Sequence, residues 1–107
     1  MAEFNLSDLA ATIAARSASG SADSYTVRLL GTGRSGCARK FGEEAVEAII
    51  AALDGDADAL TAEAADVLYH LLVLLRATDV PLERVMAELA SRTKQGGLVE
   101  KASRPPR

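Results

Sequence analysis

Hydrophobic residues recur at three- and four-residue intervals along most of the chain, the spacing that places side chains on one face of a helix. The first such segment spans residues 6–17, and either Asn5 or Ser7 is suited to cap it. Its apolar face is formed by Leu6, Leu9, Ala10 and Ile13. Residues 24–30 form a shorter apolar piece, which fits either one or two helical turns or a brief strand.

Three further helices complete the pattern. One is predicted over residues 37–53, with an apolar face formed by Phe41, Ala45, Ala48, Ile49 and Ala52. Another is predicted over residues 59–77, capped by Asp56 or Asp58. Pro81 fits the first turn of a last helix that ends near Gly96 and Gly97. The glycine-rich residues 31–36 are predicted to form a loop, and residues 103–107 a loose basic tail.

These elements predict an all-α fold, a single domain over residues 1–107 built as a bundle of four to five helices. Abundant alanine and only 4% aromatic residues suit packed helices better than a sheet. The helix over residues 59–77 is apolar on nearly every side between Ala64 and Leu75. Because two short neighbouring helices cannot cover that much apolar surface, we expect a homodimer that completes the bundle.

Charge and composition narrow the function. A formal net charge of −3 argues against general nucleic-acid binding, which usually needs a basic face. Cys37 is the only cysteine, so an internal disulfide is excluded and a reducing cytoplasm is expected. The N-terminus lacks the pattern of a signal peptide, and the longest apolar run is too short to span a membrane.

Five carboxylates on two predicted helices carry the candidate chemistry: Glu43, Glu44, Glu47, Glu63 and Asp66. Residues three or four apart share a helix face, so Glu44 lies beside Glu47, and Glu63 lies beside Asp66. Glu43 points closer to the opposite side of its helix. The turn between the two helices is short, which predicts antiparallel packing that brings the acidic pairs together.

Asp66 lies within the apolar run, where an uncompensated carboxylate costs several kcal/mol. Glu44 and Glu47 nearby add repulsion, roughly 4 kcal/mol for two like charges about 4 Å apart at an effective dielectric near 20. A hard divalent ion bound by oxygens relieves this repulsion, so the pattern predicts Mg²⁺. The alternatives are solvated acidic faces or an arginine partner for Asp66, but two acidic pairs on adjacent helices favour the metal.

The acidic pattern resembles the metal motif of the all-α nucleotide pyrophosphohydrolases of the MazG type. Its parts are Glu43-Glu44-Ala45-Val46-Glu47 and Glu63-Ala64-Ala65-Asp66. Within that superfamily the chain is similar, over residues 6–104, to the phosphoribosyl-ATP pyrophosphohydrolase family of histidine biosynthesis. The narrower resemblance rests on Ser24-Tyr25-Thr26, Lys40-Phe41-Gly42-Glu43-Glu44, Tyr69-His70 and Glu100-Lys101-Ala102-Ser103-Arg104.

The resemblance implies hydrolysis of phosphoribosyl-ATP to phosphoribosyl-AMP and pyrophosphate. It also implies Mg²⁺ as cofactor, with Glu44, Glu47, Glu63 and Asp66 as ligands. For Glu43 it leaves three roles open: supporting the ligands, holding another metal, or positioning water. Two rival functions are hydrolysis of ordinary or damaged nucleoside triphosphates, and metal binding by a helical dimer without catalysis.

Other side chains are weaker candidates. Lys40, one turn before Glu44, either binds phosphate or forms an ion pair with Glu44. His70 is either a satisfied core histidine, which is the favoured interpretation, or a group that supports Asp66 or contacts substrate. Tyr69 and Cys37 are expected to pack in the interior.

Basic residues are candidate phosphate contacts. Lys101 and Arg104 are predicted to bind the ribose 5-phosphate that distinguishes phosphoribosyl-ATP from ATP; the alternative is that they only decorate a frayed terminus. For the others, Arg28, Arg39, Arg92 and Lys94, a solvated surface is the favoured interpretation. Gly31-x-Gly33-x-x-Gly36 matches a dinucleotide-binding fingerprint, but we reject it because no second strand follows.

Overall fold

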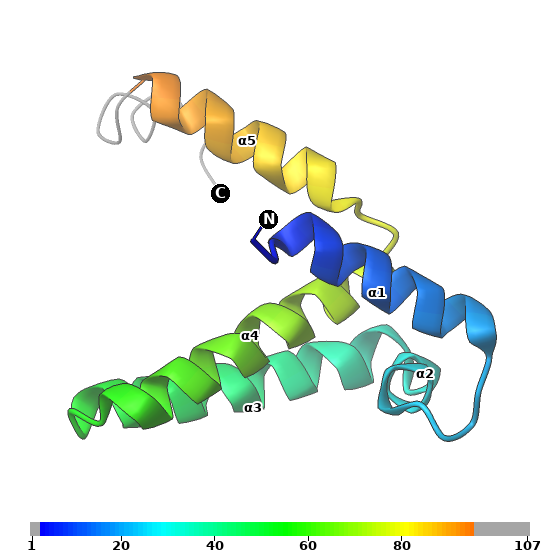
Figure 1. The fold of residues 1–107 in the computed structure, drawn as a ribbon, viewed down its shortest axis with the longest axis horizontal. Helices are drawn as coiled ribbons and strands as arrows, with labels where there is room; N and C mark the ends of the chain where they lie inside the picture. Colours follow the sequence, from blue (N-terminus) through cyan, green and yellow to red (C-terminus); the bar gives the residue numbers. More distant parts are fainter. Residues whose placement is uncertain (1–2, 96–107) are drawn as a thin grey trace.

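The computed structural model describes residues 3–95, which form five α-helices and no β-strand (Figure 1). The predicted all-α class is therefore confirmed. The helices are α1 (Leu6–Ser19), α2 (Tyr25–Gly31), α3 (Gly33–Leu53), α4 (Ala57–Ala77) and α5 (Leu82–Gln95). Of the predicted alternatives for the caps, Asn5 caps α1 through a capping box with Asp8, and Asp56 caps α4.

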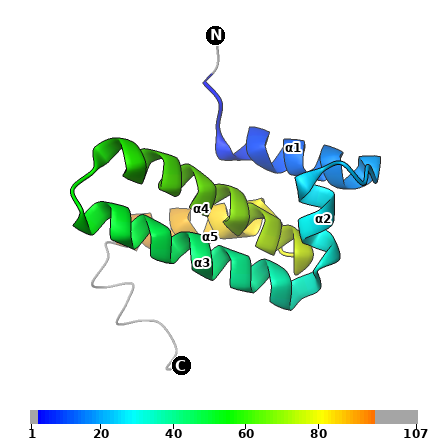
Figure 2. The ribbon, with the colours of Figure 1, turned by 90° about the horizontal axis from the view of Figure 1, so that it is seen from below.

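Helices α3 and α4 run antiparallel and side by side, as predicted (Figure 1, Figure 2). They are joined by a short turn at Gly55, whose φ of 72° suits a residue without a Cβ. Helices α1 and α2 pack against one end of this pair, where the hydrophobic core lies. The core residues are Ile13, Leu29, Cys37, Leu72, Val73 and Leu82. The other end of the α3–α4 pair projects as an arm that no other described helix covers.

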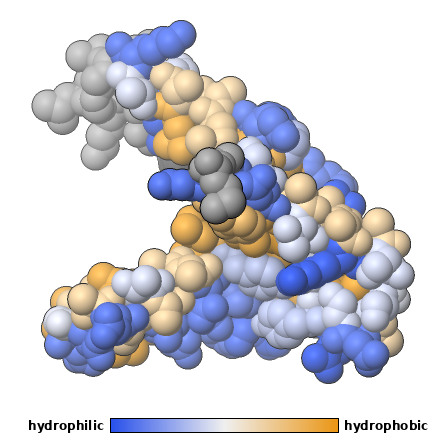
Figure 3. Space-filling model, in the orientation of Figure 1, coloured by the Kyte–Doolittle hydropathy of each residue, from blue (hydrophilic) through white to orange (hydrophobic). Residues whose placement is uncertain are grey.

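Two apolar stripes are exposed in this arrangement. The α3 stripe consists of Val46, Ile49, Ile50 and Leu53, which follow the i, i+3, i+4, i+7 spacing of one helix face and are each more than half exposed. The α5 stripe consists of Leu82, Val85, Met86 and Leu89, with the same spacing, and only Leu82 is buried. Figure 3 shows the molecule hollowed between α5 and the α3–α4 arm, with hydrophobic surface along parts of the hollow.

The segment before α3 was predicted only in part. Of the two alternatives for residues 24–30, the helix is confirmed, since α2 forms there. Residues 31–36 were predicted to be a loop and are not, because α3 already begins at Gly33. Thr32 is the only residue between the two helices, and its hydroxyl donates a hydrogen bond to the Leu29 carbonyl. Gly33 has a φ of 78°, which lets the backbone turn sharply there. The glycines therefore build a tight turn between helices.

The inward faces of α3 and α4 also differ from their predictions. Cys37, Glu44 and Ala51 are the buried residues of α3, whereas Ile49 and Ala52 of the predicted apolar face are exposed. Helix α4 was predicted to be buried on most sides, but its buried residues lie only near the core, because no third helix among residues 3–95 covers the arm. These residues are His70, Leu72 and Val73. None of the described helices has the length and hydrophobicity needed to cross a membrane.

Replacing Gly36 by alanine is expected to lower stability by roughly 1–3 kcal/mol, the usual range for overpacking. A Cβ at Gly36 would lie 2.2 Å from Thr32 Oγ1 and 2.4 Å from Thr32 Cβ, so the turn before α3 must shift. Gly42→Ala is the matched control, because its Cβ meets nothing within 4 Å and alanine favours the helix by up to about 1 kcal/mol. Urea denaturation of both variants measures the difference, and equal stabilities would contradict the predicted clash.

Candidate active site

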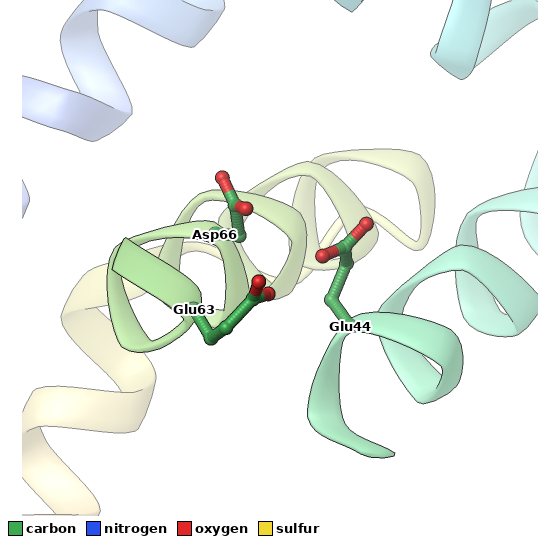
Figure 4. Close-up of side chains that lie close together, drawn as sticks. All are labelled: Glu44, Glu63 and Asp66. Atoms are coloured by element: carbon green, nitrogen blue, oxygen red, sulfur yellow. The ribbon is translucent and has the colours of Figure 1, made fainter. Parts of the chain in front are cut away.

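Three carboxylates converge between α3 and α4 (Figure 4). Glu44 comes from α3, while Glu63 and Asp66 come from α4, one helical turn apart. Each side chain offers one oxygen, and these oxygens all lie within 4.8 Å of one another. Antiparallel packing therefore brings together acidic residues from both predicted pairs.

The most buried of these carboxylates is Glu44, which is 7% exposed, and not Asp66, which is exposed in this chain. The prediction placed Asp66 in a buried environment and was wrong on that point, because the arm leaves this part of α4 open. The cost of burying a carboxylate falls instead on Glu44 and Glu63. Glu44 Oε2 and Glu63 Oε2 are buried and have no hydrogen-bond partner among the described residues.

Unpaired buried carboxylate oxygens cost free energy, and close like charges add repulsion. A cation between the helices offsets both effects. The donors are all carboxylate oxygens, the ligands that hard divalent ions such as Mg²⁺ prefer. The arrangement therefore fits a hard divalent cation.

Glu47 adjoins the three converging carboxylates. Hydrogen bonding to Glu44 raises the pKa of the Glu47 carboxyl above its ordinary value, and the negative charges of Glu44 and Glu63 raise it further. This is the effect expected of carboxylates crowded together. A fourth carboxyl group is thus available beside the cluster.

Lys40 pairs with acidic residues of its own helix. Its Nζ lies 3.2 Å from Glu44 Oε1 and 3.7 Å from Glu43 Oε2. Of the two predicted roles of Lys40, the structure contains the ion pair with Glu44, and the phosphate contact stays a prediction. Hydrogen bonding to Glu44 raises the pKa of Lys40. Glu43 is largely exposed and lies outside the cluster, as its direction on the helix predicted.

His70 is 5% exposed, and both of its ring nitrogens have partners. Nδ1 lies 2.7 Å from the backbone oxygen of Asp66, and Nε2 lies 3.1 Å from the hydroxyl of Tyr25. This agrees with the favoured interpretation of His70 as a satisfied core histidine. Tyr69 packs as predicted: its ring stacks on Tyr25 at a centroid distance of 6.2 Å, and its hydroxyl bonds to Thr26.

Tyr25 received no role from the sequence, although it belongs to the matching stretch Ser24-Tyr25-Thr26. Its hydrogen-bond partner His70 is 45 residues away, so no local spacing could have indicated the contact. Cys37 is buried as predicted, and its thiol donates to the Leu29 carbonyl.

Within the described residues, the other basic candidates form no ion pair with the converging carboxylates. Arg28, Arg39 and Lys94 are exposed, and Arg92 forms an ion pair with Glu88 at 3.2 Å. Lys101 and Arg104 lie outside the described residues.

The chain is similar to known proteins over nearly its whole length. Residues 6–93 match the family model for phosphoribosyl-ATP pyrophosphohydrolase. The phosphoribosyl-ATP pyrophosphatase 1 of Rhodopseudomonas palustris is 59% identical over 104 residues, which cover 97% of each chain. The phosphoribosyl-ATP pyrophosphatase of Jannaschia sp. is 60% identical over 99 residues, which cover 92% of this chain and 97% of the relative. The resemblance that the acidic motif indicated is therefore confirmed, and the chain belongs to the phosphoribosyl-ATP pyrophosphohydrolase family.

Proposed function

We propose that this chain hydrolyses phosphoribosyl-ATP to phosphoribosyl-AMP and pyrophosphate, the second step of histidine biosynthesis, with Mg²⁺ as cofactor. The observation that carries the proposal is the convergence of three carboxylates with two unpaired buried oxygens between α3 and α4. Family membership supports the choice of substrate. We place the reaction in the cytoplasm, where the single cysteine stays reduced.

The proposed ligands of Mg²⁺ are Glu44, Glu47, Glu63 and Asp66. When bound, the ion neutralises phosphate oxygens and stabilises the leaving pyrophosphate. A carboxylate of the cluster accepts a proton from the attacking water. Lys40 holds Glu44 through Oε1, so that the unpaired Oε2 is left for the cation. Glu43 supports this arrangement through its contact with Lys40.

The test is pyrophosphate release from phosphoribosyl-ATP, compared with ATP and deoxynucleoside triphosphates at saturating Mg²⁺. We expect kcat/KM for phosphoribosyl-ATP to be higher by about 10- to 100-fold, the contribution of one or two charge-assisted hydrogen bonds to the additional phosphate. Faster hydrolysis of plain triphosphates would favour a housecleaning pyrophosphohydrolase of the same superfamily. No release from any substrate would favour a metal-binding dimer without catalysis.

Truncation after Val99 is expected to lower kcat/KM for phosphoribosyl-ATP selectively, by about 10-fold or more, because Lys101 and Arg104 are proposed to bind its ribose 5-phosphate. ATP serves as the control substrate, since it lacks that phosphate. Unchanged kinetics on both substrates would exclude the tail and make Arg28, Arg39 or Lys40 better candidates. Equal loss on both would indicate that the tail supports the fold or the triphosphate site.

We also propose that the protein is a homodimer. The α3 stripe and the α5 stripe are both exposed and have matching apolar spacing. Helix α5 has little contact with the other described helices, and an isolated helix of 14 residues is marginally stable in water. A second chain that covers these stripes would supply the packing that α5 and the α3–α4 arm lack.

A further inference from the structure

In the tripeptide Ser24-Tyr25-Thr26 at the start of α2, one side chain is well exposed although it contacts buried residues. Ser24 caps the helix, since its side chain accepts a hydrogen bond from the Val27 amide. Thr26 is fully buried and bonds to the hydroxyl of Tyr69. Tyr25 differs from both, because it is 45% exposed although its hydroxyl is held by the buried His70. The ring of Tyr25 stacks on Tyr69, and its exposed part is free to contact a ligand while His70 holds the hydroxyl.

The Tyr25 hydroxyl is linked to the carboxylate cluster by two hydrogen bonds. His70 connects the two, because its other nitrogen bonds to the backbone of Asp66. Burial raises the pKa of Tyr25, and the charges of Lys40, Glu44 and Asp66 also act on it. The α2 helix therefore brings a hydroxyl group to a site that is otherwise built from α3 and α4.

The direction of each hydrogen bond follows from the groups involved. A backbone carbonyl only accepts, so His70 Nδ1 must carry the proton that it donates to Asp66. In the neutral imidazole, Nε2 is then an acceptor, and the Tyr25 hydroxyl donates its single proton to it. The remaining lone pairs of the Tyr25 oxygen can only accept. This oxygen is therefore unsuited to bind an ionised phosphate oxygen, and it is suited to bind a water molecule.

We propose that Tyr25 is a catalytic residue that accepts a hydrogen bond from the hydrolytic water, and that His70 is a positioning residue that orients the Tyr25 hydroxyl. The inference rests on the proposed hydrolysis of phosphoribosyl-ATP. The water donates one hydrogen to Tyr25 and the other to a carboxylate of the cluster, which leaves a lone pair directed at phosphorus.

The reaction then balances without another reactant. The water oxygen forms a bond to phosphorus while the α–β anhydride bond breaks, and pyrophosphate leaves with the electron pair. One water proton passes to the carboxylate. The other, which faced Tyr25, remains on the new phosphate group until it is lost to solvent.

Steady-state kinetics of Tyr25→Phe on phosphoribosyl-ATP test the proposal. Phenylalanine keeps the ring that stacks on Tyr69 and removes only the hydroxyl. We expect kcat to fall about 10- to 100-fold, because the water loses its orientation, while KM changes less than about 3-fold. Tyr69→Phe is the matched control: it removes the other hydroxyl of the same aromatic cluster, so Tm should fall while kcat stays within about 3-fold.

A double-mutant cycle tests the role of His70. His70→Gln should lower kcat in the wild-type background and change it less than about 3-fold in the Tyr25→Phe background, because the group it orients is then absent. If His70→Gln does not fold, the comparison of kcat between Tyr25→Phe and Tyr69→Phe is sufficient to test the role of Tyr25. Unchanged kcat in Tyr25→Phe, or a change in KM alone, would overturn the proposal. Absence of turnover in the wild-type protein would instead refute the proposed function.

Discussion

Asp66→Asn and Glu44→Gln are expected to lower kcat/KM for phosphoribosyl-ATP by roughly two to three orders of magnitude, because metal-ion stabilisation of phosphate charge is worth several kcal/mol. Each substitution keeps the shape of the side chain but removes a negative charge from the set of carboxylates within 4.8 Å. The measurement is pyrophosphate release across a magnesium titration. Near-wild-type turnover of either variant at saturating Mg²⁺ would contradict the proposed ligand set.

Glu44→Gln should lower activity without lowering the thermal stability of the metal-free protein. Glu44 and Glu63 carry unpaired buried oxygens, so Glu44→Gln relieves repulsion and should leave Tm equal or higher when magnesium is removed. Adding Mg²⁺ should raise the Tm of the wild type and have little effect on the variant, because only the intact site binds the ion. Glu43→Gln is the neighbouring comparison. Glu43→Gln should lower kcat/KM less than Glu44→Gln does, because Glu43 lies outside the cluster.

Ile49→Glu is expected to convert a dimer into a destabilised monomer. Ile49 lies in the middle of the α3 stripe and is 57% exposed within one chain. In a monomer, a charge at such an exposed position changes stability by less than about 0.5 kcal/mol. At a buried interface, the unpaired charge costs at least several kcal/mol and should raise the dissociation constant by about 100-fold or more.

Sedimentation and dilution measure this difference. The wild type should sediment as twice the 11.2 kDa chain at micromolar concentration, and its Tm should fall on dilution. Ser35→Glu adds the same charge to an exposed polar position of α3 and should behave like the wild type. A wild-type protein that sediments only as the 11.2 kDa species would contradict the dimer, and so would unchanged association of Ile49→Glu.

The sequence by itself determined the helical class, the main helices and the acidic motif, because helix periodicity, caps and the spacing within the pairs Glu44–Glu47 and Glu63–Asp66 are local properties. It could not decide which side of α3 faces α4. Apolar residues occur on two sides of that helix, and periodicity alone favoured Ile49 over the face that carries Glu44. Local pattern likewise read the glycines at 31–36 as a loop, although Thr32 and Gly33 close a tight turn there.

The tertiary structure decided which carboxylate is buried and what lies beside the site. Glu44 rather than Asp66 is enclosed, because α3 is the only described helix that covers α4 in the arm. The contact between Tyr25 and His70 joins residues 45 positions apart, and it exists only because α2 packs against the end of the α3–α4 pair. Burial and distant contacts depend on how the helices pack together, and the spacing of residues within one helix does not contain that information.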